Sequence, residues 1–379
     1  METLWRSWFP VADRVTYLNH AGVAPLSTRV AEAVGAATRE CTVWGAFRYG
    51  RLLAGLRRAR ESAARLLGVR PGNVAFVKNT SEGVSFVAEG FPWKPGEAAV
   101  VPEGEFPTNV YPWMNLARRG VRVIRVPERG GRLELDDYQK ALDEPGVRVL
   151  AVSAVEYGTG FRNDLAALGE ICRERGVFLF VDAIQALGCL PLEPQRLGVH
   201  ALAADAHKWL CGPEGIGILY LSDEALNLLH PVEVGWNSVA DPLAFDRIRF
   251  ELRPDAARFE AGSPSTIAVH GLSAAVDLLL EVGIERVWDR VRELTDRLIE
   301  GLRERRYTIA SPLASGERSG ILTFVPRRPA AELAETLHDR GVFVAARGPG
   351  LRVSPHFYNT VDDLERFFAE LDEAEKLGG

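Results

Sequence analysis

The chain has 379 residues, of which 47% are hydrophobic and 25% charged, the composition of an ordinary globular protein. Its net charge of -6 and its pI near 5.8 argue against a nucleic-acid partner, which would favour a basic surface. We find no apolar run of about 18 residues, so we expect no contact with a membrane, and the start METLWRSWFPVADR lacks the apolar core of a signal peptide.

The cysteines form no recognisable framework. They have neither a CxxC spacing nor histidine partners, which argues against a zinc site and against structural disulfides. We therefore predict a protein of the reducing cytoplasm without a metal site. The four positions are Cys41, Cys172, Cys189 and Cys211.

From about residue 74 to residue 220, short apolar runs alternate with segments of helical periodicity, such as Asp164 to Arg175. The runs are continuous, which is typical of strands buried on both faces of a parallel sheet. Ligands of such sheets bind at the carboxyl ends of the strands, so functional residues should follow the runs directly. The predicted strands cover residues 74–77, 98–102, 121–126, 147–155, 177–183, 201–206 and 215–221.

The pattern changes after about residue 250. A long helical stretch, Thr266 to Arg305, precedes the short strand ILTFV and a helix–strand–helix pattern that reaches the C-terminus. The length allows two domains. We predict a large domain over residues 15–250 and a smaller domain formed by residues 1–14 and 251–379, with the first twenty or so residues packing near the smaller domain.

The first polar cluster follows the strand predicted at residues 74–77. Thr80 and Ser81 open a segment of helical periodicity, and hydroxyl groups with free amides at a helix N-terminus form an anion site. Simple capping of the helix by either residue explains the pattern without a ligand. Lys78 is a candidate counter-ion or nucleophile, although it precedes the turn.

Asp182 ends the apolar run VFLFVDA, and Gln185 follows three residues later. An aspartate in this position often caps a helix or a turn. The functional alternative places its carboxylate against the pyridinium nitrogen of a bound cofactor, with Gln185 donating to the ring oxygen.

Lysine is rare in this chain, which has only five lysines among its 45 basic residues. Lys208 lies between a predicted strand and the turn GPEGIG. A lysine whose head lies in solvent is the ordinary explanation, but a buried lysine, unlike arginine, can lose its proton and act as a nucleophile. GPEGIG is not a dinucleotide motif, because a strand follows it where a helix should begin.

Together, VDAIQA and HKW with GPEGIGILY resemble the class V aminotransferase family of pyridoxal-phosphate (PLP) enzymes. This group includes cysteine desulfurases, isopenicillin-N epimerase-like proteins and kynureninases, and the likeness extends from YLNHAGVAP to RVSPHFYNT. It implies the PLP-dependent transferase fold type I, in which an α/β large domain with a mostly parallel sheet carries a smaller α+β C-terminal domain.

The resemblance also implies roles for the residues that match the motifs. Lys208 resembles the Schiff-base lysine and Asp182 the partner of the pyridine nitrogen, and these two are the implied catalytic residues. Gln185 resembles the contact to the ring hydroxyl, and Phe106 the aromatic ring that stacks on the cofactor. Arg352 resembles the arginine that binds the substrate carboxylate. The implied phosphate ligands are Thr80, Ser81, His207 and, reaching the neighbouring subunit of a homodimer, Ser263.

The sequence departs from the desulfurase pattern in three places. Asp205 replaces a phosphate-binding serine, and although it stays among the implied cofactor-binding residues, we expect it to orient His207. Ala154 lies where a polar ring contact is common. The segment between Arg347 and Arg352 is only GPGL, where desulfurases carry a longer loop with their nucleophilic cysteine. Because persulfide transfer needs a thiolate, we predict that the protein is not a cysteine desulfurase.

These expectations favour a PLP-dependent enzyme that acts at the α-amino group of an amino acid or small amine, first of all a transaminase. The same proton abstraction also leads to epimerisation or to loss of a β-substituent, so an epimerase or a Cβ-lyase is an alternative. A PLP-binding protein without turnover is a further alternative. The complete set of Lys208, Asp182 and Arg352 argues against it.

Overall fold

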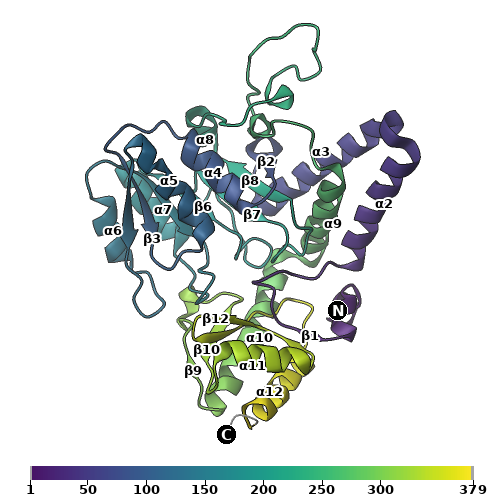
Figure 1. Ribbon diagram of the computed structural model, residues 1–379, viewed down its shortest axis with the longest axis vertical. Helices are drawn as coiled ribbons and strands as arrows, with labels where there is room; N and C mark the ends of the chain where they lie inside the picture. The colour runs from purple at the N-terminus through teal and green to yellow at the C-terminus, as the bar shows by residue number, and fades with distance from the viewer. Residues whose placement is uncertain (1, 377–379) are drawn as a thin grey trace.

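The computed structural model describes residues 2–376 (Figure 1). At its centre lies a seven-stranded sheet in the order β2-β8-β7-β6-β5-β3-β4. All seven predicted strands are present and close to their predicted bounds. They are β2 (Val74–Val77), β3 (Ala98–Pro102), β4 (Arg122–Val126), β5 (Val147–Ser153), β6 (Phe178–Asp182), β7 (Ala201–Asp205) and β8 (Gly217–Leu221).

The sheet is mostly parallel, as predicted. Strands β4, β3, β5, β6 and β7 are parallel neighbours, whereas β8 pairs antiparallel with both β7 and β2. The β7–β8 pair is antiparallel because the connection between these strands is too short for the crossover that a parallel pair requires.

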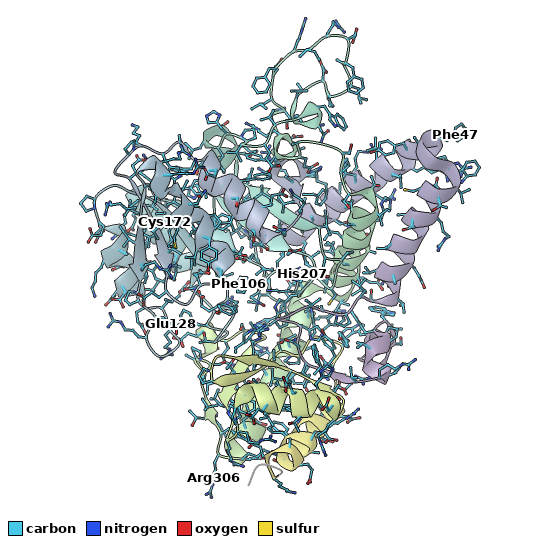
Figure 2. All side chains as sticks on the ribbon, viewed as in Figure 1. Phe47, Phe106, Glu128, Cys172, His207 and Arg306 are labelled. Atoms are coloured by element: carbon cyan, nitrogen blue, oxygen red, sulfur yellow. The ribbon has the colours of Figure 1, made fainter. Side chains whose placement is uncertain are left out.

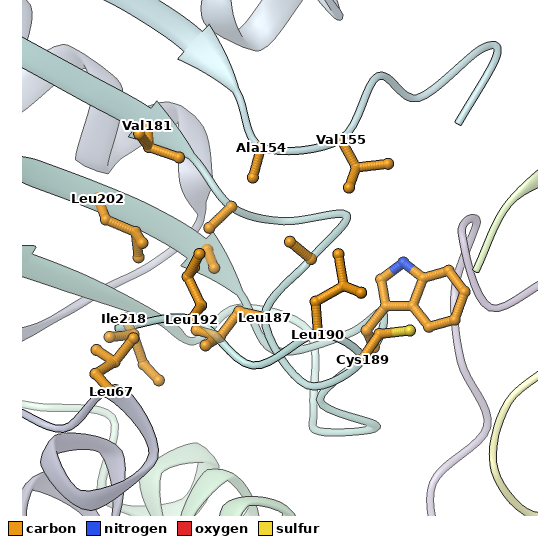
Figure 3. Close-up of a cluster of buried hydrophobic side chains, with 14 of the residues drawn as sticks. Leu67, Ala154, Val155, Val181, Leu187, Cys189, Leu190, Leu192, Leu202 and Ile218 are labelled. Carbon is orange, nitrogen blue, oxygen red and sulfur yellow. The ribbon is translucent and has the colours of Figure 1, made fainter. Parts of the chain in front are cut away.

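Both faces of the sheet are buried, which explains why its strands read as continuous apolar runs. Val181 and Leu202 belong to one apolar cluster, whereas the adjacent residues Phe180 and Ala203 belong to another on the opposite face. Figure 3 shows part of the first cluster, in which Val181 and Leu202 lie with Leu187.

Helices cover the two faces of the sheet (Figure 1). The second cluster is shared with α4 (Thr80–Gly90), α5 (Tyr111–Asn115) and α8 (Asp223–Leu228). The first cluster is shared with helices on the other face, and α2 (Thr28–Trp44) packs outside them against α9. These helices are α3 (Tyr49–Leu67), α6 (Leu135–Leu142), α7 (Leu165–Arg175) and α9 (Thr266–Val282).

The long helical stretch predicted from Thr266 to Arg305 is two helices rather than one. Helix α9 ends at Val282 and α10 (Ile284–Glu304) begins after Gly283, whose φ of 89° lies outside the helical region. The two helix axes are bent by 78°. Periodicity alone missed this break, because apolar residues recur at helical spacing on both sides of the glycine.

The C-terminal part contains a four-stranded antiparallel sheet in the order β12-β13-β10-β9, whose apolar face packs on α10, α11 and α12. The chain start joins this part, since β1 (Thr16–Tyr17) pairs with β11 (Val342–Phe343). The remaining elements are α1 (Glu2–Ser7), β9 (Thr308–Ile309), β10 (Leu322–Val325), α11 (Ala330–Asp339), β12 (Ala345–Arg347), β13 (Gly350–Val353) and α12 (Val361–Lys376).

The division into residues 15–250 and residues 1–14 with 251–379 stays a proposal, and residues 1 and 377–379 lie outside the described residues. We propose a later boundary between α9 and α10, because α9 packs on α2 and α3 of the large domain. No single helix between residues 2 and 376 is long and apolar enough to cross a membrane, although α9 and α10 together pass that test as a bent pair.

Candidate active site

The candidate site lies at the carboxyl edge of the central sheet, between this sheet and the C-terminal part of the chain, where Figure 2 labels Phe106 and His207. Lys208 lies in a tight turn after β7. The turn is closed by the amide of Cys211, which donates to the Lys208 carbonyl at 2.9 Å, and by the amide of Gly212, which donates to Ala206 at 2.8 Å. The turn directs Lys208 toward Phe106, with Nζ 5.7 Å from the ring centroid.

Asp182 reaches the same edge from the neighbouring strand. Strands β6 and β7 run parallel with Asp182 opposite Ala203, so the turn bearing Lys208 and the end of β6 emerge together. The carboxylate is 2% exposed and accepts a hydrogen bond from the Ile184 amide at 3.0 Å. Burial raises the pKa of Asp182 to about 6, against the opposing effects of the Ile184 amide and Lys208. The group is therefore mainly ionised at neutral pH.

The charge of Lys208 is weakened by its surroundings. Burial lowers the pKa of Lys208 to about 8, Asp182 opposes this effect, and the positive charges of Arg352 and Arg347 reinforce it. A substantial fraction of the lysine is therefore a neutral amine at neutral to mildly alkaline pH, which is the form that acts as a nucleophile or base.

The residues predicted to bind an anion lie at the start of helix α4. Its N-cap is Asn79, whose side chain accepts from the Glu82 amide, so the suggestion that Thr80 or Ser81 caps the helix is wrong. The Oγ1 atom of Thr80 is buried and has no hydrogen-bond partner within the described residues. Ser81 Oγ lies 2.8 Å from Thr108 Oγ1. An unpartnered hydroxyl at a helix N-terminus is suited to an anion.

His207 and Asp205 form the pair expected from the sequence. His207 Nδ1 lies 3.1 Å from Asp205 Oδ1. Asp205 is buried at the end of β7, and its Oδ1 also accepts from the Ala206 amide at 3.0 Å. The pair fixes the orientation of the imidazole and leaves Nε2 for another partner, while Asp205 itself faces histidine rather than an anion.

Gln185 is held by the protein. Its Nε2 donates to the Ala21 carbonyl at 3.0 Å, and its Oε1 accepts from Trp209 Nε1 at 2.9 Å. One amide hydrogen is left over for a ligand. Trp209 is fully buried, and its carbonyl lies 2.9 Å from His356 Nε2, so the residue beside Lys208 is anchored on both sides.

Arg352 lies on β13, facing the large domain. It is 1% exposed, and its Nη1 donates to the Tyr157 carbonyl at 2.8 Å and Nη2 to Asn19 Oδ1 at 3.4 Å. The Nε atom is buried without a partner in the described part of the chain. Burial, followed by the effect of Arg347, lowers the pKa of Arg352 to about 9, so the guanidinium stays charged at neutral pH.

Two sequence candidates do not join this group within one chain. Lys78 is exposed and forms an ion pair with Glu82 at 2.7 Å, which makes it a poor nucleophile. Ser263 is exposed and lines a separate cavity of 270 Å³ with Lys78 and Glu82.

Phe106, whose ring faces Lys208, is 44% exposed and packs edge-on against Tyr157, with the ring centroids 5.1 Å apart.

A pair of buried carboxyl groups behind Asp182 was not predicted. Glu105 accepts hydrogen bonds from the Ser153 amide at 2.5 Å and its hydroxyl at 2.6 Å, and Ser153 lies opposite Asp182 in the sheet. Asn163 Nδ2 donates to Glu156 at 2.9 Å. Burial raises the pKa of Glu105 to about 8 and that of Glu156 well above its ordinary value. Both residues follow predicted strands, so the expectation that functional residues lie at the carboxyl ends of the strands would have identified them.

The four cysteines are free, and three of them are buried thiols. Cys172, Cys189 and Cys211 are buried, and burial raises the pKa of each thiol, in the case of Cys172 to about 12. Cys189 lies within the apolar cluster of Figure 3, and Cys41 lies in the last turn of α2. Among residues 2–376, no group of three or more metal-ligating side chains could hold a metal ion.

Comparison with known proteins gives a consistent result. A model of the class-V aminotransferase family matches residues 16–367. A probable cysteine desulfurase of Pseudomonas aeruginosa is 32% identical over 406 residues and is aligned over 98% of each chain. The isopenicillin N epimerase of Streptomyces clavuligerus is 32% identical over 336 residues, which cover 84% of each chain.

Solved structures have the same fold. A cysteine desulfurase from Escherichia coli matches with a TM-score of 0.87 at 26% identity, over 100% of this chain and 99% of that one. A C-DES variant with glycine covalently linked to its PLP cofactor matches with a TM-score of 0.91 at 23% identity, over 97% of this chain and 98% of that one. At that identity the second likeness speaks for the fold alone.

The side chains at the site fit PLP. The cofactor needs an amine for its aldehyde, a carboxylate for its ring nitrogen and an anion cradle for its phosphate. Lys208 with its lowered pKa, the buried carboxylate of Asp182 and the unpartnered hydroxyl of Thr80 at the start of α4 match these three needs.

Proposed function

The chain belongs to the class V aminotransferase family of PLP-dependent enzymes, and from this premise we propose that it is a transaminase acting on the α-amino group of an amino acid or small amine. The observation that carries the proposal is the meeting of Lys208, Asp182 and Arg352 at one edge of the sheet, close enough for Asp182 and Arg352 to perturb the pKa of Lys208.

When bound, PLP supplies an electron sink that makes the α-proton of an amino acid acidic. Asp182, at the end of β6, would supply the negative charge for the ring nitrogen. Lys208 would hold the cofactor through its aldehyde. Phe106 would cover the ring, and Thr80, Ser81 and His207 would hold the phosphate. Gln185, fixed by Trp209, would offer its remaining amide hydrogen to the ring oxygen.

The protein residues divide the remaining work. Arg352 binds the substrate carboxylate and sets the orientation of the α-carbon, because its buried Nε is free to donate. With PLP bound, Nζ of Lys208 would take up the α-proton and hold it for return, and hydrolysis by water would then release the 2-oxo acid and leave the amino group on the cofactor. Proton transfer at one nitrogen suits a lysine with a pKa of about 8.

The proposal excludes desulfuration by persulfide transfer, although relatives bear the name cysteine desulfurase. The hairpin between Arg347 and Arg352 has no cysteine, and the three buried thiols are held in the protonated form by burial. A thiol that stays protonated is a poor acceptor of sulfur.

An amino-acid epimerase or Cβ-lyase is the alternative, and one observation favours the epimerase. Inversion needs a second proton carrier besides Lys208, and Tyr157 places a phenol beside the ring of Phe106. The resemblance to isopenicillin N epimerase points in the same direction. Tyr157→Phe would abolish an epimerase while leaving a transaminase largely active.

We also propose a homodimer in the cytoplasm. Large apolar side chains are strongly exposed at the tip between α2 and α3 and in the long loop after α8, with Phe47 84% and Ile248 91% exposed. A contact between copies would bury them and bring Ser263 to the partner's site. The four unpaired cysteines suit a reducing compartment.

The test is incubation of the PLP-loaded enzyme with a panel of amino acids and a 2-oxo acid. We expect a 2-oxo acid product from the donor and a new amino acid from the acceptor. Inverted configuration without 2-oxo acid would identify an epimerase, and loss of a β-substituent a lyase. No reaction with any substrate, while Lys208 binds PLP, would identify a binding protein without turnover.

A further inference from the structure

Two arginines of one hairpin lie on the same face of the small sheet. Strands β12 and β13 pair antiparallel, with Ala345 opposite Arg352 and Arg347 opposite Gly350. Directly opposed residues, and residues two apart along a strand, project to one side of a sheet. Arg347 and Arg352 are therefore diagonal neighbours, with Cα atoms about 7–8 Å apart.

This face looks toward the large domain at the candidate site. Thr323 lies opposite Arg352 on β10, and its Oγ1 donates to the Gly158 carbonyl at 2.8 Å. Arg352 donates to the carbonyl of the preceding residue, Tyr157. Position 350 has to be glycine, because a Cβ there would lie 2.5 Å from Thr323 Cγ2.

The two guanidinium groups differ in their surroundings. Arg352 is buried and tied to Tyr157 and Asn19, whereas Arg347 is exposed. The Arg347 guanidinium donates to the Ala346 carbonyl at 2.8 Å, and no carboxylate of residues 4–376 forms an ion pair with it.

Both charges act on the catalytic lysine. Arg352 and Arg347 both lower the pKa of Lys208, and Arg347 also lowers that of Arg352. A substrate α-carboxylate would neutralise Arg352 alone. Arg347 would remain as an unbalanced positive charge beside the bound substrate.

We infer that Arg347 is the binding site for a second negative group of the substrate, so that the preferred substrates are amino acids with a side-chain carboxylate. This inference rests on the proposed function, since it takes Arg352 as the site of the α-carboxylate. One charge-assisted hydrogen bond at Arg347 predicts about a tenfold to hundredfold preference for the acidic ligand.

The test measures binding first, because binding does not depend on turnover. Glutarate and butyrate, which differ by one carboxylate, are titrated by calorimetry into the PLP-loaded enzyme at low ionic strength, where exposed charges are least screened. We expect glutarate to bind ten to a hundred times more tightly. Arg347→Gln should remove this difference and leave butyrate binding unchanged, whereas Arg352→Gln should weaken both ligands.

Arg122→Gln is the matched control, since Arg122 is also an exposed strand arginine whose guanidinium donates to a backbone carbonyl. It should keep the full preference. Equal affinity of the two ligands for the unmodified enzyme, or an equal loss of both in Arg347→Gln, would overturn the inference.

Turnover of glutamate against glutamine then gives the corresponding ratio of kcat/KM. Absence of any turnover with the binding preference intact would count against the proposed function and not against the subsite.

Discussion

Replacing Asp182 with asparagine tests the electrostatic role of this residue without disturbing its packing. Asparagine has nearly the same shape, and its side-chain oxygen can still accept the hydrogen bond from the Ile184 amide, which is 3.0 Å long in the native protein. The change therefore removes the negative charge and retains the local structure.

The expected loss follows from the burial of Asp182. Two unit charges 4 Å apart attract by about 1 kcal/mol in bulk water but by about 4 kcal/mol at an effective dielectric constant near 20. The second value applies, because Asp182 is 2% exposed. At 1.36 kcal/mol for each factor of ten, we expect kcat to fall by about a thousandfold. The affinity for PLP should fall much less, since the covalent link and the phosphate contacts remain.

The assay follows the half-reaction with the best amino-acid donor under single-turnover conditions, with PLP binding measured separately by absorbance. Asp164→Asn is the control, because Asp164 also accepts a bond from a nearby backbone amide, that of Ala167 at 3.0 Å, at the start of α7. Unchanged turnover in Asp182→Asn, or equal losses in both variants, would refute the reasoning.

Three further predictions concern other groups. Arg352→Ala should raise the KM of carboxylated substrates at least tenfold and leave plain amines unaffected, and equal effects on both would assign it a structural role. Burial raises the pKa of Glu105 from 4.5 to about 8, so the folded protein binds a proton here that the unfolded chain has lost between about pH 4.5 and 8. In this range the contribution of Glu105 to the free energy of unfolding should therefore fall as the pH rises, by up to about 1.4 kcal/mol per pH unit. Glu105→Gln should flatten that fall in denaturant titrations, and an equally steep fall would contradict the protonated state. Lys78→Ala should keep PLP binding and turnover within about twofold, since Lys78 is exposed and paired with Glu82, and a larger loss would reopen its role.

Much of the large domain could be predicted from the sequence, because its strands are buried on both faces. Two-sided burial demands continuous apolar runs, and the run ending at Asp182 is fully buried in the structure. The same pattern predicts that Asp182 and Lys208 lie at one edge of the sheet. Their meeting in the fold follows from the parallel pairing of β6 and β7.

Other features depend on contacts that periodicity does not encode. The helical periodicity continues through Gly283 into α10, so it does not predict the break there. The break depends on the backbone conformation of Gly283 and on the packing of α9 against α2 and α3. The carboxyl groups of Glu105 and Glu156 meet because β3 and β5 are neighbours in the sheet, an order that the sequence does not specify. The shared face of Arg347 and Arg352 likewise depends on the register of a short hairpin.

The attachment of PLP to Lys208 is the claim on which the rest depends. Borohydride reduction of the PLP-loaded enzyme, followed by peptide mass spectrometry, locates the modified lysine. We predict a single adduct on Lys208 that is lost in a folded Lys208→Ala variant. An adduct on Lys78 or on any of the other lysines, with Lys208 unmodified, would contradict the account.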